Sequence, residues 1–116
     1  MKQFTESHEW VDEQGRVGVT SFARQELGEV VSIELPQVGA VVKGGEPLCV
    51  IESTKAAADI YAPVSGRVVE VNEALKRDLS LLNKSPEEGG WLVRIEVRGT
   101  EKLLSLLEYR KLIGSK

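Results

Sequence analysis

One lysine lies between two strand-like runs in the segment ESTKAAADIYAPVSG, which covers residues 52–66. Lys55 follows Ser53 and Thr54 and precedes three alanines, so no bulky neighbour in the sequence shields its side chain. A primary amine at the end of a tight turn can enter the cleft of another protein. The alternative is that Lys55 is a solvated surface charge, as most lysines at loop tips are.

The rest of the chain offers no competing set of reactive residues. It contains a single histidine and a single cysteine, and it lacks a glycine-rich phosphate loop and a local Ser/His/Asp set. Cys49 stands in the apolar run PLCVI, where a free thiol usually behaves as a small buried hydrophobe. We therefore expect no metal site and no internal disulfide.

Length and charge restrict the class of protein. The 116 residues fit one domain, residues 1–116. Lys and Arg total 15 against 18 Asp and Glu, and this net charge of -3 gives no broad cationic surface for nucleic acid or membrane lipid. The apolar runs are too short to span a bilayer and the N-terminus lacks a signal or transit pattern, which predicts a cytoplasmic protein.

Short apolar segments separated by Gly, Pro and Asn turn signals predict a mainly β protein, a small sandwich or barrel. Gly15 marks a hairpin turn between Val11 and Val17. The predicted strands lie at residues 10–11, 16–19, 30–35, 41–42, 48–51, 60–61, 68–71 and 91–97.

Two helices are predicted beside the strands. The segment FARQEL can be capped by Thr20 or Ser21 and ended by Gly28, which indicates one short internal helix. The C-terminal stretch TEKLLSLLEYRKLIG has apolar residues at helical spacing, with Thr100 before it and Gly114 after it. We expect this helix to pack on the core; the alternative is a helix that binds a partner.

An internal repeat relates two segments around Lys55. After a shift of 27 positions, IELPQVGAVVKGGEPL matches IYAPVSGRVVEVNEAL at seven residues without a gap. Each copy reads as a strand, a Pro-x-x-Gly turn and a second strand. Two such units can pack face to face about a pseudo-twofold axis and cover each other's apolar sides. Lys55 lies between the copies, at the far end of a hairpin.

These segments carry a family resemblance. SHEWV, LGEVVSIELPQVGA, GEPLCVIESTKAAADIYAPVSGRVVEVNEAL, LLNKSP and GGWL closely resemble the H protein of the glycine cleavage system, from about Phe4 to the C-terminal helix. The core E-S-x-K-A-x-x-D-x-Y-x-P distinguishes it from biotin carriers, which place their lysine between two methionines, and from lipoyl domains of 2-oxo acid dehydrogenase complexes, which more often read D-K-A.

The resemblance implies a barrel-sandwich hybrid with lipoic acid in amide linkage to Lys55. It implies a carrier without catalytic activity of its own, which takes the aminomethyl group of glycine from the glycine decarboxylase to the aminomethyltransferase. A dihydrolipoyl dehydrogenase then reoxidises the lipoyl group, and a lipoate ligase or a lipoyl or octanoyl transferase attaches it. We expect the carrier to be a monomer.

The resemblance also implies a cleft that shelters the aminomethylated arm. In the family its acceptors are the serine and glutamate of S-H-E-W and the aspartate four residues after the modified lysine, which correspond to Ser7, Glu9 and Asp59. The alternatives are a turn or cap role for Ser7 and surface carboxylates for Glu9 and Asp59. We interpret His8 as a packing or hydrogen-bonding residue beside Trp10 rather than a general base.

Two other functions stay open at this point. The chain could be an H-like lipoyl carrier that relays lipoate to other enzymes or serves a redox or stress pathway. It could also be an unmodified β domain that binds a partner through the same hairpin.

Overall fold

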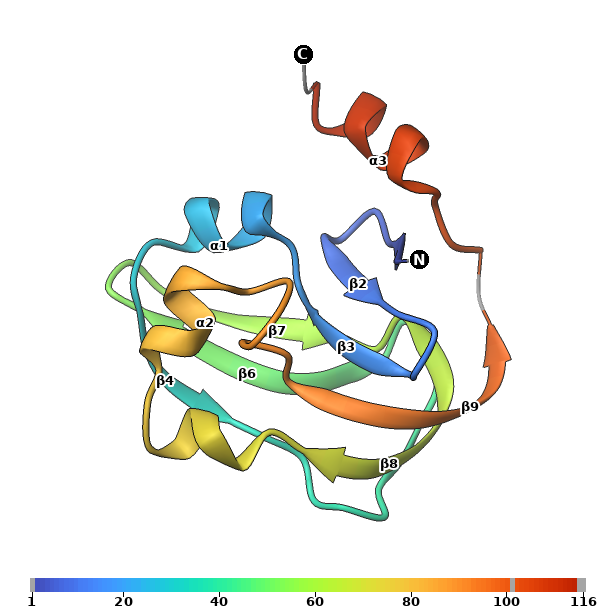
Figure 1. Ribbon diagram of the computed structural model, residues 1–116, viewed down its shortest axis with the longest axis horizontal. Coiled ribbons are helices and arrows are strands. Elements are labelled where there is room, and N and C mark those ends of the chain that lie inside the picture. Colours follow the sequence, from blue (N-terminus) through green and yellow to red (C-terminus); the bar gives the residue numbers. More distant parts are fainter. Residues whose placement is uncertain (1, 101, 115–116) are drawn as a thin grey trace.

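The computed structural model describes residues 2–100 and 102–114. The strands are β1 (Gln3–Phe4), β2 (Glu9–Val11), β3 (Arg16–Val19), β4 (Val30–Glu34), β5 (Val41–Val42), β6 (Pro47–Ser53), β7 (Ala57–Tyr61), β8 (Val64–Val71) and β9 (Val93–Thr100). Within the described residues they form a six-stranded sheet, β1-β2-β3-β9-β8-β5, and a three-stranded sheet, β4-β6-β7 (Figure 1). This confirms the predicted mainly β class.

The two sheets enclose an apolar core that their inward-facing residues supply. Strand β8 shows the pattern clearly, because Val64, Val68 and Val71 are buried whereas Arg67 and Glu70 face solvent. Cys49 on β6 is 5% exposed, and its burial raises the pKa of the thiol to about 12. The prediction that Cys49 is a small buried hydrophobe is therefore confirmed.

The first hairpin and the internal helix follow the predicted signals. Strands β2 and β3 pair antiparallel across a turn in which Gly15 has φ 83°, and a Cβ there would clash with the carbonyl oxygen of Ile95. Helix α1 (Ser21–Leu27) begins after Thr20, whose hydroxyl accepts a hydrogen bond from the Ala23 amide at 3.2 Å. Of the two caps considered, Thr20 is the one used.

The internal repeat corresponds to a symmetric strand pair. Strands β5 and β8 are antiparallel, with Val41 opposite Arg67. In the repeat, Val41 of the first copy corresponds to Val68 of the second, and Arg67 of the second corresponds to Ala40 of the first. This equivalent pair is also in contact, because the Val68 amide donates to the Ala40 carbonyl at 2.8 Å. The equivalent strands of the two copies are thus paired antiparallel and related by a local twofold axis. This confirms the twofold relation that the repeat predicted.

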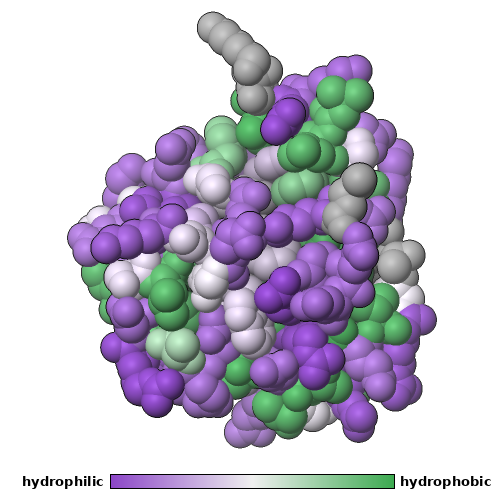
Figure 2. All heavy atoms as spheres, viewed as in Figure 1, coloured by the Kyte–Doolittle hydropathy of each residue, from purple (hydrophilic) through white to green (hydrophobic). Residues whose placement is uncertain are grey.

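The predicted C-terminal helix is present and packs on the core through Tyr109, which lies in a buried cluster with Phe4 and Trp10, but the helix begins later than predicted. Helix α3 spans Leu106–Leu112 and begins after Ser105, which forms a capping box with Glu108. Leu104 precedes the helix and forms a bridge with Phe4. Within α3 the buried side chain is Tyr109, whereas Leu107 is 65% exposed. Figure 2 shows apolar side chains at the surface where this helix lies.

Two short helical segments were not predicted, η1 (Glu73–Lys76) and α2 (Ser80–Lys84). Asn72 starts the first, accepting from the Ala74 amide at 3.3 Å, and its side-chain nitrogen donates to the Gly89 and Trp91 carbonyls at 3.0 and 2.8 Å. These bonds hold the η1 segment to the connection that leads into β9. In the described part of the chain, no helix has the length and apolar character needed to cross a bilayer.

Candidate functional site

Lys55 lies in the turn between β6 and β7, the tight turn at the left of Figure 1. Ser53 builds this turn. Its hydroxyl oxygen accepts from the amides of Lys55 and Ala56 at 3.1 and 3.2 Å, and the Ser53 amide donates to the Ala56 carbonyl at 2.9 Å. A serine two residues before the lysine therefore fixes the backbone that presents it.

The lysine turn is also attached to the segment that follows α1. The Thr54 amide donates to the Glu29 carbonyl at 2.9 Å. A Cβ built on Gly28, where φ is 81°, would lie 3.5 Å from Cδ and Cε of Lys55, so the aliphatic stem of the lysine crosses this glycine. The turn has a fixed backbone while the amine remains at the surface.

The environment of Lys55 leaves its amine available. The side chain is exposed, and its neighbours Ala56 and Ala57 are exposed small residues. Among residues 2–100 and 102–114, no ion pair to Lys55 is found. An uncovered amine on a narrow turn fits the interior of an enzyme that modifies it.

A second cluster forms around Glu9 on β2, which is 1% exposed. The hydroxyls of Thr5 and Ser7 both donate to its Oε1 at 2.6 Å, and the Tyr61 amide donates to Oε2 at 3.3 Å. Burial raises the pKa of the Glu9 carboxyl, and these hydrogen bonds oppose the rise. Within the described residues the donors to this buried carboxyl group are neutral, which makes it an acceptor site suited to a cation.

The Glu9 cluster lies in a groove of about 600 Å³. Its lining residues come from the turn before β2, the turn before β6, the end of β7 and the segment before α3: Thr5, Glu6, Ser7, Glu9, Gly44, Gly45, Tyr61, Ala62, Pro63, Lys102 and Leu104. The glycines and Pro63 leave room for a ligand beside the carboxylate. The groove thus combines open space, a lining of both polar and apolar residues, and one buried carboxyl group.

The four residues predicted from the sequence lie along one path. Ser7 and Glu9 meet in the groove, and Tyr61 beside them is the last residue of β7. Asp59 does not line the groove; it is exposed on β7, two positions before Tyr61 and on the same side of the strand. Lys55 precedes Tyr61 by six residues, and six residues of extended chain span about 20 Å at a rise of about 3.3 Å per residue. Asp59 therefore lies between the lysine and the groove.

His8 hydrogen-bonds and packs as predicted, but its partners differ from those expected. Nδ1 is 2.8 Å from the hydroxyl oxygen of Tyr109, and the ring lies 4.8 Å from the ring of Phe22. Trp10 instead donates its indole N–H to the carbonyls of Val19 and Pro86 at 2.9 and 3.0 Å. Burial lowers the pKa of His8, which favours the neutral imidazole.

Sequence reasoning missed Thr5 and the backbone of Tyr61. Thr5 contacts Glu9 twice, because its hydroxyl donates to the carboxylate and accepts from the Glu9 amide at 3.0 Å. The spacing of four residues in the segment T-E-S-H-E was a usable signal, since Thr side chains often bond backbone groups of nearby turns. The Tyr61 amide carried no sequence signal, because it reaches Glu9 only through the packing of β7 beside β2.

Ser7→Ala is expected to raise the pKa of Glu9 further, because the alanine removes a donor that stabilises the ionised carboxylate. A carbon-detected NMR titration of the Glu9 carboxyl gives both values, with Ser80→Ala as a matched control in which a serine bound to the surface carboxylate of Asp78 is removed instead. A Glu9 pKa that falls or stays constant in Ser7→Ala would contradict the assigned hydrogen bond.

Comparisons with known proteins identify the family of the chain. A family model described as glycine cleavage H-protein matches residues 2–114. The glycine cleavage system H protein of Thermotoga maritima is 50% identical over 111 residues, covering 93% of this chain and 90% of that protein. The H protein of Deinococcus deserti is 51% identical over 106 residues, covering 91% and 87%.

A solved structure gives the same result for the fold. The crystal structure of a glycine cleavage system H protein from Mycobacterium marinum superposes with a TM-score of 0.92 at 38% sequence identity. The alignment covers 97% of this chain and 96% of that one.

Proposed function

Because the chain belongs to the glycine cleavage H-protein family, we propose that it is the lipoyl carrier of a glycine cleavage system, with lipoic acid in amide linkage to Lys55. The observation that carries this proposal is the exposed lysine on the Ser53-built turn between the two repeat copies. We also propose that residues 1–116 act as a single carrier domain without catalytic activity of its own.

The residues around Lys55 fit a covalently attached prosthetic group. The amine is accessible, its neighbours are small, and its backbone is fixed by Ser53 and Glu29. Acylation would remove the lysine charge, and no anionic partner found in the described chain would lose an ion pair as a result. When bound, a lipoyl group supplies a disulfide that can be opened by exchange and can carry the aminomethyl group of glycine.

The residues of the groove supply what a cationic amine needs. We propose that Glu9 and Ser7 accept hydrogen bonds from the carried amine, and that Asp59 attracts it at the edge of the strand. Burial of Glu9 strengthens its attraction for a cation, because less water competes at the carboxylate. Asp59 contributes less, because it is exposed and screened.

The partners follow from the same role. We propose the glycine decarboxylase, the aminomethyltransferase and the dihydrolipoyl dehydrogenase as partners, and a lipoate ligase or a lipoyl or octanoyl transferase as the modifying enzyme. The exposed face of β7 from Ala57 through Asp59 to Tyr61 gives the attached arm a path between the lysine turn and the groove. The monomeric state and the cytoplasmic location stay predictions.

Glycine-dependent exchange of labelled carbon dioxide tests the carrier role. With a glycine decarboxylase present, the lipoylated protein is expected to support exchange, and the unmodified protein is expected to give only the background rate. The matched control is Lys55→Arg taken through the same lipoylation reaction. Equal rates with the lipoylated and unmodified proteins would contradict the proposed function.

A further inference from the structure

We infer that Tyr109 of α3 is a positioning residue for the groove, because its hydroxyl holds the turn from which Ser7 and Glu9 project. The inference deepens the proposed function, since that function gives the two acceptors their purpose. The contacts that support it lie entirely in this chain and are independent of the prosthetic group.

The turn that carries Ser7 and Glu9 has an unfavourable backbone conformation. His8 stands between them with φ 74°, the single positive φ of a non-glycine residue in the described ranges. Left-handed backbone angles are unfavourable for residues that have a Cβ. Because His8 separates the two acceptors, its backbone angles decide whether both side chains face the groove.

Contacts on both sides of His8 maintain that conformation. Its amide donates to the Thr5 carbonyl at 3.1 Å, and its own carbonyl accepts from the Thr20 amide at 3.0 Å. Its ring nitrogen Nδ1 meets the Tyr109 hydroxyl at 2.8 Å, and the same hydroxyl lies 2.7 Å from Oγ1 of Thr20. Tyr109 thus joins the His8 turn to the residue that caps α1.

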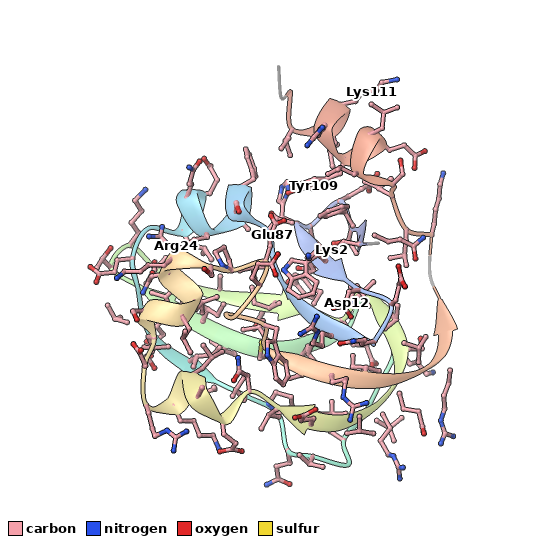
Figure 3. The ribbon with its side chains drawn as sticks, viewed as in Figure 1. Lys2, Asp12, Arg24, Glu87, Tyr109 and Lys111 are labelled. Carbon is pink, nitrogen blue, oxygen red and sulfur yellow. The ribbon has the colours of Figure 1, made fainter. Side chains whose placement is uncertain are left out.

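Tyr109 is itself held in place. It is 4% exposed, and its ring stacks on Phe4 with a centroid distance of 4.8 Å and an interplanar angle of 11°. Phe4 and Leu104 exchange backbone hydrogen bonds of 2.8 and 2.6 Å just before α3 begins. Figure 3 shows Tyr109 where α3 meets the rest of the molecule. The helix therefore presents the hydroxyl from a rigid position.

Amide hydrogen exchange in the unlipoylated protein tests the inference with Tyr109→Phe, which keeps the ring that stacks on Phe4. The Glu9 amide donates to the Thr5 hydroxyl, and the Tyr61 amide donates to the Glu9 carboxyl group. Both amides are expected to exchange about tenfold faster in the variant, which is the change expected for one lost hydrogen bond. The amide of Ile95, bonded to the Gly15 carbonyl at 2.8 Å, is expected to change less than twofold, because it reports on the whole fold.

Two further variants make the test specific. Leu107→Ala on the exposed side of α3 is expected to leave all three amides unchanged. His8→Asn is expected to stay close to the wild type, because asparagine tolerates positive φ and places a polar atom where Nδ1 lies.

Each outcome decides the inference. Acceleration at Glu9 and Tyr61 alone supports it. Unchanged Glu9 and Tyr61 amides in Tyr109→Phe would overturn it, as would acceleration of Ile95 by the same factor, which would show general destabilisation. Because the protein is unlipoylated, the result is independent of whether Lys55 carries a lipoyl group.

Discussion

Lys55→Arg is expected to abolish lipoylation completely while the protein keeps its fold and charge. Arginine remains cationic at neutral pH and has no amine that forms the lipoyl amide. The turn should be unaffected, because the Ser53 hydroxyl accepts from the backbone amide of residue 55 and not from its side chain. Intact mass after incubation with lipoate and a lipoate ligase gives the result directly.

Lys43→Arg is the matched control for that experiment. Lys43 is also exposed in a turn, and its backbone amide donates to the Glu46 carboxylate at 3.0 Å. The Lys43→Arg variant is expected to accept one lipoyl group on Lys55, as the wild type does. An adduct on Lys55→Arg, or loss of the adduct in Lys43→Arg, would contradict the assignment of the attachment site.

Glu9→Gln is expected to accelerate loss of the aminomethyl group from the loaded carrier by about 10- to 100-fold. The substitution keeps the size of the side chain and removes the charge, and a hydrogen bond to a charged group contributes about 1.5–3 kcal/mol. Lipoylation of Lys55 should be unchanged, because Glu9 lies at the other end of β7. The first-order release rate at neutral pH measures the effect.

Asp59→Asn and Glu46→Gln serve as comparisons for the Glu9 variant. Asp59 is exposed beside the path to the groove, so its loss is expected to accelerate release by only about 2- to 5-fold, the range of a screened surface interaction. Glu46 is exposed outside the residues that line the groove, and its substitution should leave the rate unchanged. An unchanged release rate in Glu9→Gln would contradict the proposed role of the groove.

The buried carboxyl of Glu9 also sets the sign of a pH effect on stability. Its folded pKa is raised, chiefly by burial, so the protonated form is favoured in the folded state relative to the unfolded state. Its contribution to stability is therefore fully present below the unfolded pKa and is lost as the pH rises through the raised folded pKa. Above the raised folded pKa the carboxylate is held ionised at a cost in stability, as expected for a group kept for binding.

The local features that position Lys55 could be predicted from the sequence. The repeat predicted a twofold relation between its two copies, which the pairing of β5 with β8 shows, and the small residues around Lys55 predicted an exposed turn. The two ends of α1, at Thr20 and Gly28, could also be predicted, because helix caps depend on residues that are close together in the sequence. These signals are local, so tertiary packing had little opportunity to override them.

The features that depend on distant contacts were not predictable in the same way. Burial of Glu9 results from packing of the end of β7 beside β2, whereas the residue type alone favoured a surface carboxylate. The contact between His8 and Tyr109 joins residues that are 101 positions apart. The leucine spacing before Ser105 resembled a helix, but pairing of Leu104 with Phe4 kept that segment extended.

Peptide-level mass spectrometry of the protein isolated from its own cells tests the central claim most directly. We predict a lipoyl group in amide linkage on the peptide that contains Lys55, and unmodified peptides for the other lysines. A native protein that carries no acyl group on Lys55 under conditions in which lipoylated enzymes of the same cells are modified, or that carries the group on a different lysine, would contradict the account.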